Sequence, residues 1–198
     1  MLKSNLAIFL LIFSAAMVIA QADTSKTLIT GGNDSVEVRK GDKVYKFSYA
    51  DIAAIYTQNG IDAAAAGEFS SAISEFETAL LYTPGDPDLY YNIGLACYFL
   101  ADYESSISNI DRAISLNEKN TGYYGQRGIS YCMTGSFDKA ISDFNKMLEI
   151  DPQSGDAYAN LGAVYIMMEN IPEACKNIAK AAALGNEKAM SLQDKYCR

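Results

Sequence analysis

Tyr90-Tyr91-Asn92-Ile93-Gly94 decides the fold, because its first and last residues recur at a fixed interval along the chain. Glycines follow one another at intervals of 34 residues, and a tyrosine stands four residues before each of them. A fixed period of this length indicates one supersecondary unit that is stacked against copies of itself to build a continuous core. We therefore expect a repeat protein whose function lies on a surface. The recurring positions are Gly60, Gly94, Gly128 and Gly162, with Tyr56, Tyr90, Tyr124 and Tyr158.

A second cluster follows each glycine in phase and indicates a second helix. Small, large and small residues alternate in this cluster at offsets of four and three residues, which place them on one stripe of a helix. Each unit is therefore predicted to be a pair of helices, and the glycines are predicted to let the two helices pack closely. The three sets are Ala72, Ser106, Ala140 and Ala174; Phe76, Ile110, Phe144 and Ile178; and Ala79, Ala113, Met147 and Ala181.

The motif of residues 90–94 and its counterpart Tyr158-Ala159-Asn160-Leu161-Gly162, each followed by the second cluster, resemble the tetratricopeptide repeat. Pro84 and Pro152 close their units where that family places its proline. The resemblance implies an all-α fold, an α-solenoid of four antiparallel helix-pair repeats with a C-terminal capping helix. The expected ranges are 53–86, 87–120, 121–154 and 155–186 for the repeats and 187–197 for the cap, within a domain of residues 51–198.

Three kinds of position depart from the family pattern. We expect these departures to weaken single units without changing the fold. Glu118 and Asn186 replace the closing proline, Ala63 and Cys97 replace an aromatic residue of the first helix, and Asn59 and Arg127 replace its leucine.

The start of the chain predicts export. Lys3 precedes an apolar run from Leu6 to Ile19, which ends in Ala20-Gln21-Ala22, a pattern that signal peptidase accepts. We interpret residues 1–22 as a signal peptide, so the mature chain is expected to be periplasmic or secreted, without stable membrane insertion. A run of about 14 apolar residues is short for a membrane span of about 20. An uncleaved N-terminal membrane anchor is the alternative.

Residues 23–50 form a separate N-terminal arm. Short alternations of apolar and polar residues at 36–38 and 44–47 flank Lys40-Gly41-Asp42. This pattern favours a small β-hairpin, but isolated hairpins are marginal in water. The arm is therefore expected to be either a hairpin pinned on the first repeat or loosely ordered.

Charge and cysteine usage limit the partners and predict one cross-link. From Asp51 onward the chain has 20 acidic and 10 basic side chains, and nucleic-acid binding needs a basic stripe, so we expect no nucleic-acid partner. Export permits disulfides. Cys175 stands where the other units have isoleucine and Cys197 ends the predicted cap, so we predict a Cys175–Cys197 disulfide, with two free thiols as the alternative. Cys97 and Cys132 are expected to be buried free thiols.

Catalysis is not expected. The chain has no histidine, which removes the commonest general base and a principal metal ligand. It also lacks GxSxG, GxxxxGK[ST] and a dinucleotide fingerprint. We therefore predict no catalytic residue, no cofactor and no metal site.

The family resemblance implies that the first helices line a concave groove. Aromatic and methionine side chains there offer large, adaptable contacts to a partner. Family members that grip a terminal carboxylate use Lys, Asn and Arg, and this chain has Thr57, Ile61, Gly122 and Gln126 at the corresponding places, so that clamp is not expected. The predicted partner-binding residues are Tyr91, Asn92, Leu95, Tyr98, Phe99, Gln126, Met133, Asn160 and Met167.

These expectations combine into one hypothesis about function. We expect an exported adaptor that binds an apolar or amphipathic peptide segment of another protein in its groove. The alternative is a structural envelope protein that self-associates as a homo-oligomer through the same groove, and an enzyme comes third.

Overall fold

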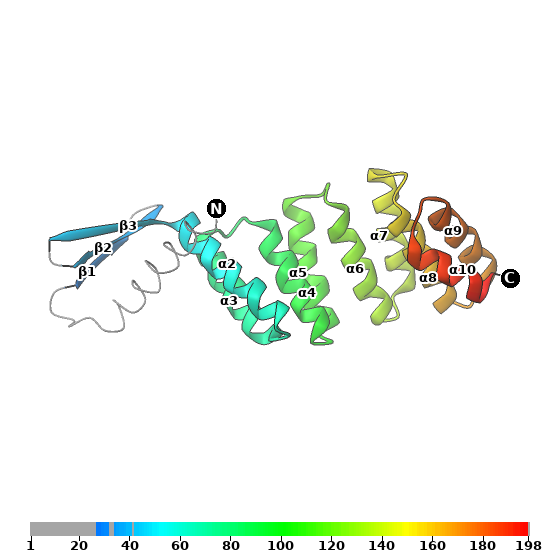
Figure 1. The fold of residues 1–198 in the computed structure, drawn as a ribbon, viewed down its shortest axis with the longest axis horizontal. Helices are drawn as coiled ribbons and strands as arrows, with labels where there is room; N and C mark the ends of the chain where they lie inside the picture. The colour runs from blue at the N-terminus through cyan, green and yellow to red at the C-terminus, as the bar shows by residue number, and fades with distance from the viewer. Residues whose placement is uncertain (1–26, 32–33, 41, 198) are drawn as a thin grey trace.

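The computed structural model describes residues 27–31, 34–40 and 42–197. Within them, helices stack in antiparallel pairs along one elongated row, with a small β-sheet at one end and a last helix at the other (Figure 1). The predicted all-α solenoid of helix-pair repeats is confirmed. The pairs are α2 (Tyr49–Ala65) with α3 (Phe69–Tyr82), α4 (Pro87–Phe99) with α5 (Tyr103–Leu116), α6 (Thr121–Met133) with α7 (Phe137–Ile150), and α8 (Gly155–Met167) with α9 (Ile171–Ala183), followed by α10 (Glu187–Tyr196).

Polar side chains begin the first helix of each unit. Ser48 caps α2, because its hydroxyl accepts a hydrogen bond from the backbone N–H of Asp51 at 3.1 Å. Ser154 caps α8 in the same way through the N–H of Ala157 at 3.2 Å. Asn120 caps α6 by accepting a hydrogen bond from the backbone N–H of Gly122 at 3.0 Å, so this helix begins at Thr121, the first residue of the expected third repeat.

Each signature glycine lies directly against the large residue of its own second helix. A Cβ atom added at any of the four would come within 2.6 Å of that side chain, well inside ordinary van der Waals contact. The glycines therefore act as packing residues, as predicted. The contacts are Gly60 with Phe76, Gly94 with Ile110, Gly128 with Phe144 and Gly162 with Ile178.

The units alternate with a period of two. Units one and three turn from their first to their second helix through Gly67 and Gly135, at φ 80° and 73°. Units two and four make the same turn through Ala101 and Glu169, at φ 60° and 59°. The large residue of the second helix alternates in the same way, phenylalanine in odd units and isoleucine in even ones. Odd units thus resemble each other more than they resemble their neighbours.

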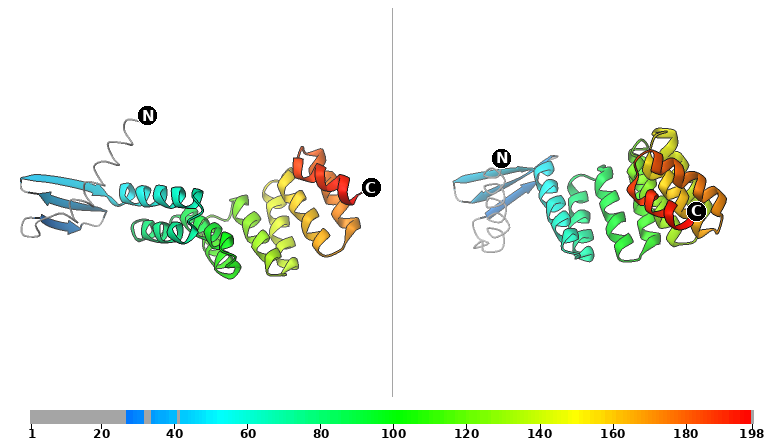
Figure 2. Two further views of the ribbon diagram at one scale, coloured as in Figure 1. Left: turned by 60° about the horizontal axis from the view of Figure 1, so that its bottom comes forward. Right: turned by 45° about the vertical axis from the view of Figure 1, so that its right-hand side comes forward.

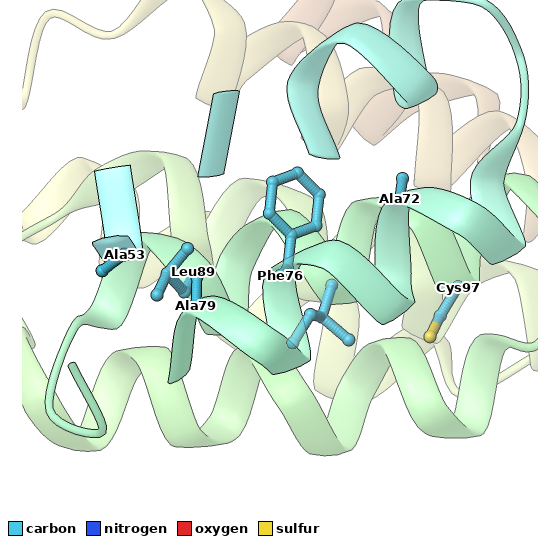
Figure 3. Close-up of a cluster of buried hydrophobic side chains, with 7 residues drawn as sticks. Ala53, Ala72, Phe76, Ala79, Leu89 and Cys97 are labelled. Carbon is cyan, nitrogen blue, oxygen red and sulfur yellow. The ribbon is translucent and has the colours of Figure 1, made fainter. Parts of the chain in front are cut away.

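The core is continuous from one unit to the next. Around Phe76, side chains of α2, α3 and α4 meet in one cluster (Figure 3), which is how the second unit covers the open face of the first. Cys97 belongs to this cluster as a free thiol, and Cys132 on α6 is a second, half-buried one. Burial raises the pKa of both thiols, to about 11 for Cys132, so both stay protonated and poorly nucleophilic at neutral pH.

The N-terminal arm contains an antiparallel sheet in the order β1 (Thr27–Gly31), β2 (Ser35–Lys40), β3 (Lys43–Ser48). The suggested hairpin corresponds to β2 and β3, with Val38 opposite Tyr45, and β1 is an additional strand that was not predicted. β3 runs directly into α2, so the sheet projects from the end of the solenoid (Figure 2). The predicted signal peptide lies outside the described residues. No helix in the described part has the length and apolar character that a membrane crossing requires.

At the other end, α10 packs on α9 and is cross-linked to it. Cys175 of α9 and Cys197 form a disulfide with their Cα atoms 5.5 Å apart. Asn186 caps α10 through the N–H of Ala189, and its amide also donates to Asp156 of α8 at 2.7 Å. The last helix is therefore fixed by the disulfide, its cap and its packing on α9.

Reducing this disulfide is expected to destabilise the C-terminal end. The bond closes a loop with a sequence separation of 22, and removing a cross-link of that size should lower the free energy of unfolding by about 2–4 kcal/mol. Denaturant unfolding of a Cys175→Ser/Cys197→Ser variant would measure this loss, and hydrogen exchange should show faster opening of α10 than of α4. Equal stability of the two proteins would contradict the prediction.

Candidate partner-binding groove

The first helices of successive units form one surface. α4 contacts α6, α6 contacts α8, and α8 contacts α10, while each second helix packs on its own first helix. We call the surface formed by α2, α4, α6 and α8 the first-helix face. It presents the residues predicted to bind a partner.

The structure divides the predicted residues into exposed and half-buried ones. Phe99, Met133 and Met167 expose 60%, 47% and 50% of their surface at the C-terminal ends of α4, α6 and α8. These three recur one unit apart and form an apolar row that a bound segment can contact. The others are half-buried: Tyr91, Asn92, Leu95, Tyr98, Gln126 and Asn160.

Tyr91 belongs more to the scaffold than to the binding surface. Its ring packs on Tyr123 of the next unit with the centroids 5.1 Å apart, and the Tyr123 hydroxyl donates a hydrogen bond to Asp88. Burial raises the pKa of both tyrosines, and the Asp88 carboxylate raises it further. This cluster joins α4 to α6, so we assign Tyr91 to the packing between units two and three.

One apolar pocket opens on the first-helix face between α2, α3 and α4. Its volume is about 210 Å³, and it brings together three predicted residues, Asn92, Leu95 and Phe99. The Phe99 ring stacks on Phe69 with the centroids 4.8 Å apart, which fixes one wall. The remaining predicted residues lie outside this pocket. Its full lining is Ile61, Ala64, Phe69, Phe76, Asn92, Leu95, Ala96 and Phe99.

Part of this pocket was not predicted from the sequence. Phe69 comes from a second helix, and the prediction considered first helices only. The available signal was a large apolar or aromatic residue at the first position of every second helix: Phe69, Tyr103, Phe137 and Ile171. Gln126, which was predicted, has a buried amide nitrogen that makes no hydrogen bond within the described residues.

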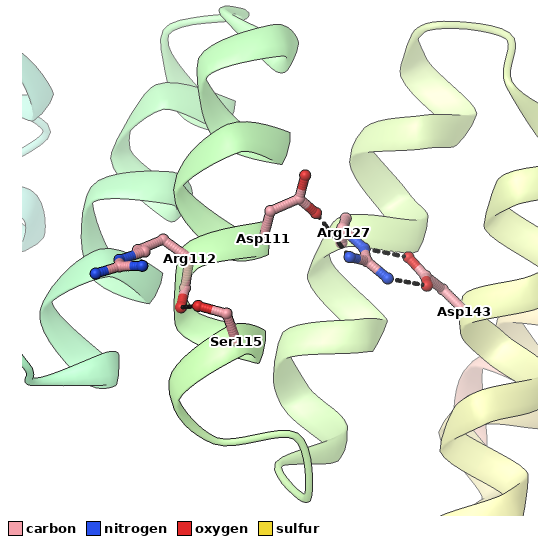
Figure 4. A network of polar contacts seen from close by, with 5 residues as sticks. All are labelled: Asp111, Arg112, Ser115, Arg127 and Asp143. Carbon is pink, nitrogen blue, oxygen red and sulfur yellow. Dashed lines mark hydrogen bonds and ion pairs between the residues drawn. The ribbon is translucent and has the colours of Figure 1, made fainter.

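The first helices carry acidic residues and a single cation, Arg127. That guanidinium donates to both oxygens of Asp143, at 2.6 and 2.9 Å, and to Asp111 at 2.6 Å (Figure 4). Burial would lower the pKa of Arg127, but the hydrogen bonds and charges of these two carboxylates raise it above its ordinary value. Arg127 is therefore fully engaged inside the solenoid and is not available to a partner.

A second hollow surrounds this ion cluster. It has a volume of about 330 Å³ and is lined by polar side chains of α5, α6 and α7. Arg127 also lies over the rings of Tyr124 and Tyr131, at 5.6 and 5.8 Å from their centroids. Its two carboxylates already bind Arg127, and Lys139 lies over the Tyr131 ring at 5.3 Å from the centroid, so we assign this hollow to the structure of unit three. Its lining residues are Asp111, Arg127, Tyr131, Lys139, Ser142 and Asp143.

Comparisons with known proteins agree with this geometry. Two sequence profiles, both described as tetratricopeptide repeat, match residues 87–120 and 144–176. The crystal structure of MamA matches with a TM-score of 0.63 at 25% identity, covering 72% of this chain and 88% of MamA. No curated protein matches the chain in sequence.

Two further solved structures are described as holding or binding peptides. YrrB, a TPR protein with an unusual peptide-binding site, matches with a TM-score of 0.64 at 27% identity, covering 74% of this chain and 79% of YrrB. The first TPR of Spaghetti, bound to an HSP90 peptide, matches at 0.57 and 22% identity, covering 60% of this chain and 94% of that one, and shows the fold alone. With four stacked helix pairs and two profile matches, the chain is a tetratricopeptide repeat protein.

Proposed function

We propose that this protein is an interaction module that binds an apolar or amphipathic peptide segment of another protein on its first-helix face. The observation that carries the proposal is the apolar pocket between α2, α3 and α4, whose rim residue Phe99 is 60% exposed. Met133 and Met167 continue the apolar row beyond it. The peptide-binding site named for YrrB, a structural neighbour, supports the same class of function.

We also propose that this binding takes place outside the cytoplasm and without catalysis. The apolar run from Leu6 to Ile19 with Ala20-Gln21-Ala22 supports export, and the Cys175–Cys197 disulfide is of a kind that persists in oxidising compartments. A histidine-free chain with its first-helix cation engaged offers a binding surface more readily than a catalytic centre.

Truncating the exposed row should release the partner without unfolding the chain. A Phe99→Ala/Met133→Ala variant removes exposed contact area, and hot-spot truncation of this kind weakens binding by about 2 kcal/mol or more. Crosslinking of the protein in its native host, followed by mass spectrometry, should show a foreign protein with the unchanged chain and lose it with the variant. Leu81→Ala is the matched control, because Leu81 is 78% exposed on α3, a second helix.

The same spectra test the remaining parts of the proposal. A mature chain that begins at Gln21 or Asp23 supports export by signal cleavage, whereas retention of residues 6–19 indicates the membrane anchor. Crosslinks only between copies of this chain, lost with the variant, would replace the adaptor with a self-associating envelope protein. A foreign partner that both variants retain would show that binding does not use the first-helix face.

A further inference from the structure

We propose that the segment bound on the first-helix face is cationic and places one large apolar side chain in the pocket between α2, α3 and α4. This inference rests on the proposed function and adds the chemistry of the partner. It is carried by two independent features of the same face, the shape and lining of the pocket and the charge of the side chains along the first helices.

The pocket fits an apolar side chain. Its volume of about 210 Å³ is several times the share of about 30 Å³ that one water molecule occupies in the liquid. Asn92 is the one polar side chain in its lining, and the stacked rings of Phe69 and Phe99 form an aromatic wall. Ile61 and Phe99, both in the lining, are 45% and 60% exposed, so the pocket is open to solvent.

The charge on the same face is negative. Asp62 follows Ile61 on α2, Asp88 lies in the first turn of α4, and Asp156 lies in the first turn of α8. All three are exposed, and none of the ion pairs found in the described residues involves them. Their side chains accept hydrogen bonds from neutral groups only, those of Gln58, Tyr123 and Asn186.

The cations of the solenoid lie elsewhere. Arg127, the single cation of the first helices, is held by Asp111 and Asp143. Lysines such as Lys139 and Lys176 belong to second helices. An acidic segment on the first-helix face would therefore meet three carboxylates and no available cation, whereas lysine or arginine beside an apolar anchor would be attracted on approach.

A designed peptide tests this chemistry. The probe is fluorescein-labelled Lys-Lys-Ala-Phe-Leu-Ala-Lys-Lys, and its binding to the purified protein is followed by fluorescence anisotropy. One control peptide replaces every Lys with Glu, and another replaces Phe-Leu with Ala-Ala. We expect the cationic probe to bind at least roughly tenfold more tightly than either control, and to weaken as NaCl rises from about 50 to about 500 mM.

Variants of the protein locate the effect. Asp62→Asn/Asp156→Asn keeps the oxygens that accept from Gln58 and Asn186 but removes two charges, so affinity for the cationic probe should fall by roughly threefold or more. Asp138→Asn, on the second helix α7, removes one exposed charge elsewhere and should change little. Phe99→Ala should weaken the cationic probe by removing one pocket wall, and thermal melting monitors the fold of each variant.

The outcomes separate this inference from the function on which it rests. If the Lys and Glu peptides bind equally and both lose affinity for Phe99→Ala, the inference of a cationic partner is wrong, but the apolar pocket remains the binding site. Binding of the cationic probe that neither Phe99→Ala nor the double Asp variant weakens would show nonspecific attraction to an acidic protein and overturn the site. A native partner that survives Phe99→Ala/Met133→Ala would refute the proposed function itself.

Discussion

Replacing Arg127 with Leu is expected to lower the free energy of unfolding by about 3–5 kcal/mol near pH 7, because it leaves a buried carboxylate without its partner. The side chain of Asp143 is 6% exposed and receives two hydrogen bonds from the guanidinium. Asp111 also loses a bond, but its side chain is 51% exposed, so water replaces that interaction at little cost. Urea unfolding of both proteins measures the difference.

The loss should depend on pH in a defined direction. Burial raises the pKa of Asp143, and Arg127 opposes this increase, so the variant should have a still higher pKa at this carboxyl. Between the unfolded value of about 3.9 and the raised folded value, the native state of the variant binds more protons than the unfolded state. Its stability therefore falls as pH rises through that window, and the difference from the parent protein should shrink on acidification.

The chain supplies its own control for this experiment. Unit four has Leu161 and Asn177 at the positions of Arg127 and Asp143, and the Asn177 amide donates to the carbonyl of Glu173 at 2.8 Å. Arg127→Leu/Asp143→Asn copies that arrangement and should recover most of the stability, without the added pH dependence. If Arg127→Leu alone is as stable as the parent protein at neutral pH, the ion cluster makes no net contribution to the free energy of unfolding.

The sequence predicted the helix pairs and their signature contacts because the repeat reports the same packing four times. It did not explain Arg127, which was interpreted as a weakened leucine site. The signal was present in a pair of positions: Asn59 donates to Glu75 at 3.2 Å, and Arg127 binds Asp143 across the same interval of residues. At this one position of the repeat, units one and three have a polar residue in the first helix and an acid in the second, whereas units two and four pair Ile93 with Asn109 and Leu161 with Asn177.

The candidate site was harder to predict because exposure depends on neighbouring units. Tyr91 and Phe99 are both aromatic residues of α4, and the sequence gives them equal weight. The structure distinguishes them, because Tyr91 is half-buried against Tyr123 of the next unit. Phe99 instead stacks on Phe69 of the preceding unit and remains 60% exposed. These contacts join neighbouring units, and the residue types at the contacting positions differ from one unit to the next. The periodic pattern of the sequence therefore does not predict them.

The second large effect concerns the packing of glycine against phenylalanine in unit three. Phe144 is 1% exposed, and Phe144→Ala is expected to lower the free energy of unfolding by about 3–5 kcal/mol, as cavities left by buried phenylalanines do. Gly128→Ala alone should also destabilise, by about 1–2 kcal/mol. Its Cβ would lie 2.5 Å from the ring of Phe144, and the resulting overpacking outweighs the gain in helix propensity of about 1 kcal/mol.

Combining the two changes should reverse the sign of the glycine substitution. Once the Phe144 ring is gone, the added methyl meets no obstacle, so Gly128→Ala should stabilise the Phe144→Ala protein by about 1 kcal/mol through helix propensity. Gly125→Ala on the same helix is the control, because its Cβ meets only the flexible end of Met147 at 3.4 Å. It should stabilise both backgrounds alike. If Gly128→Ala destabilises both backgrounds equally, close approach to Phe144 is not the reason for a glycine at this position, and by analogy not at Gly60 either.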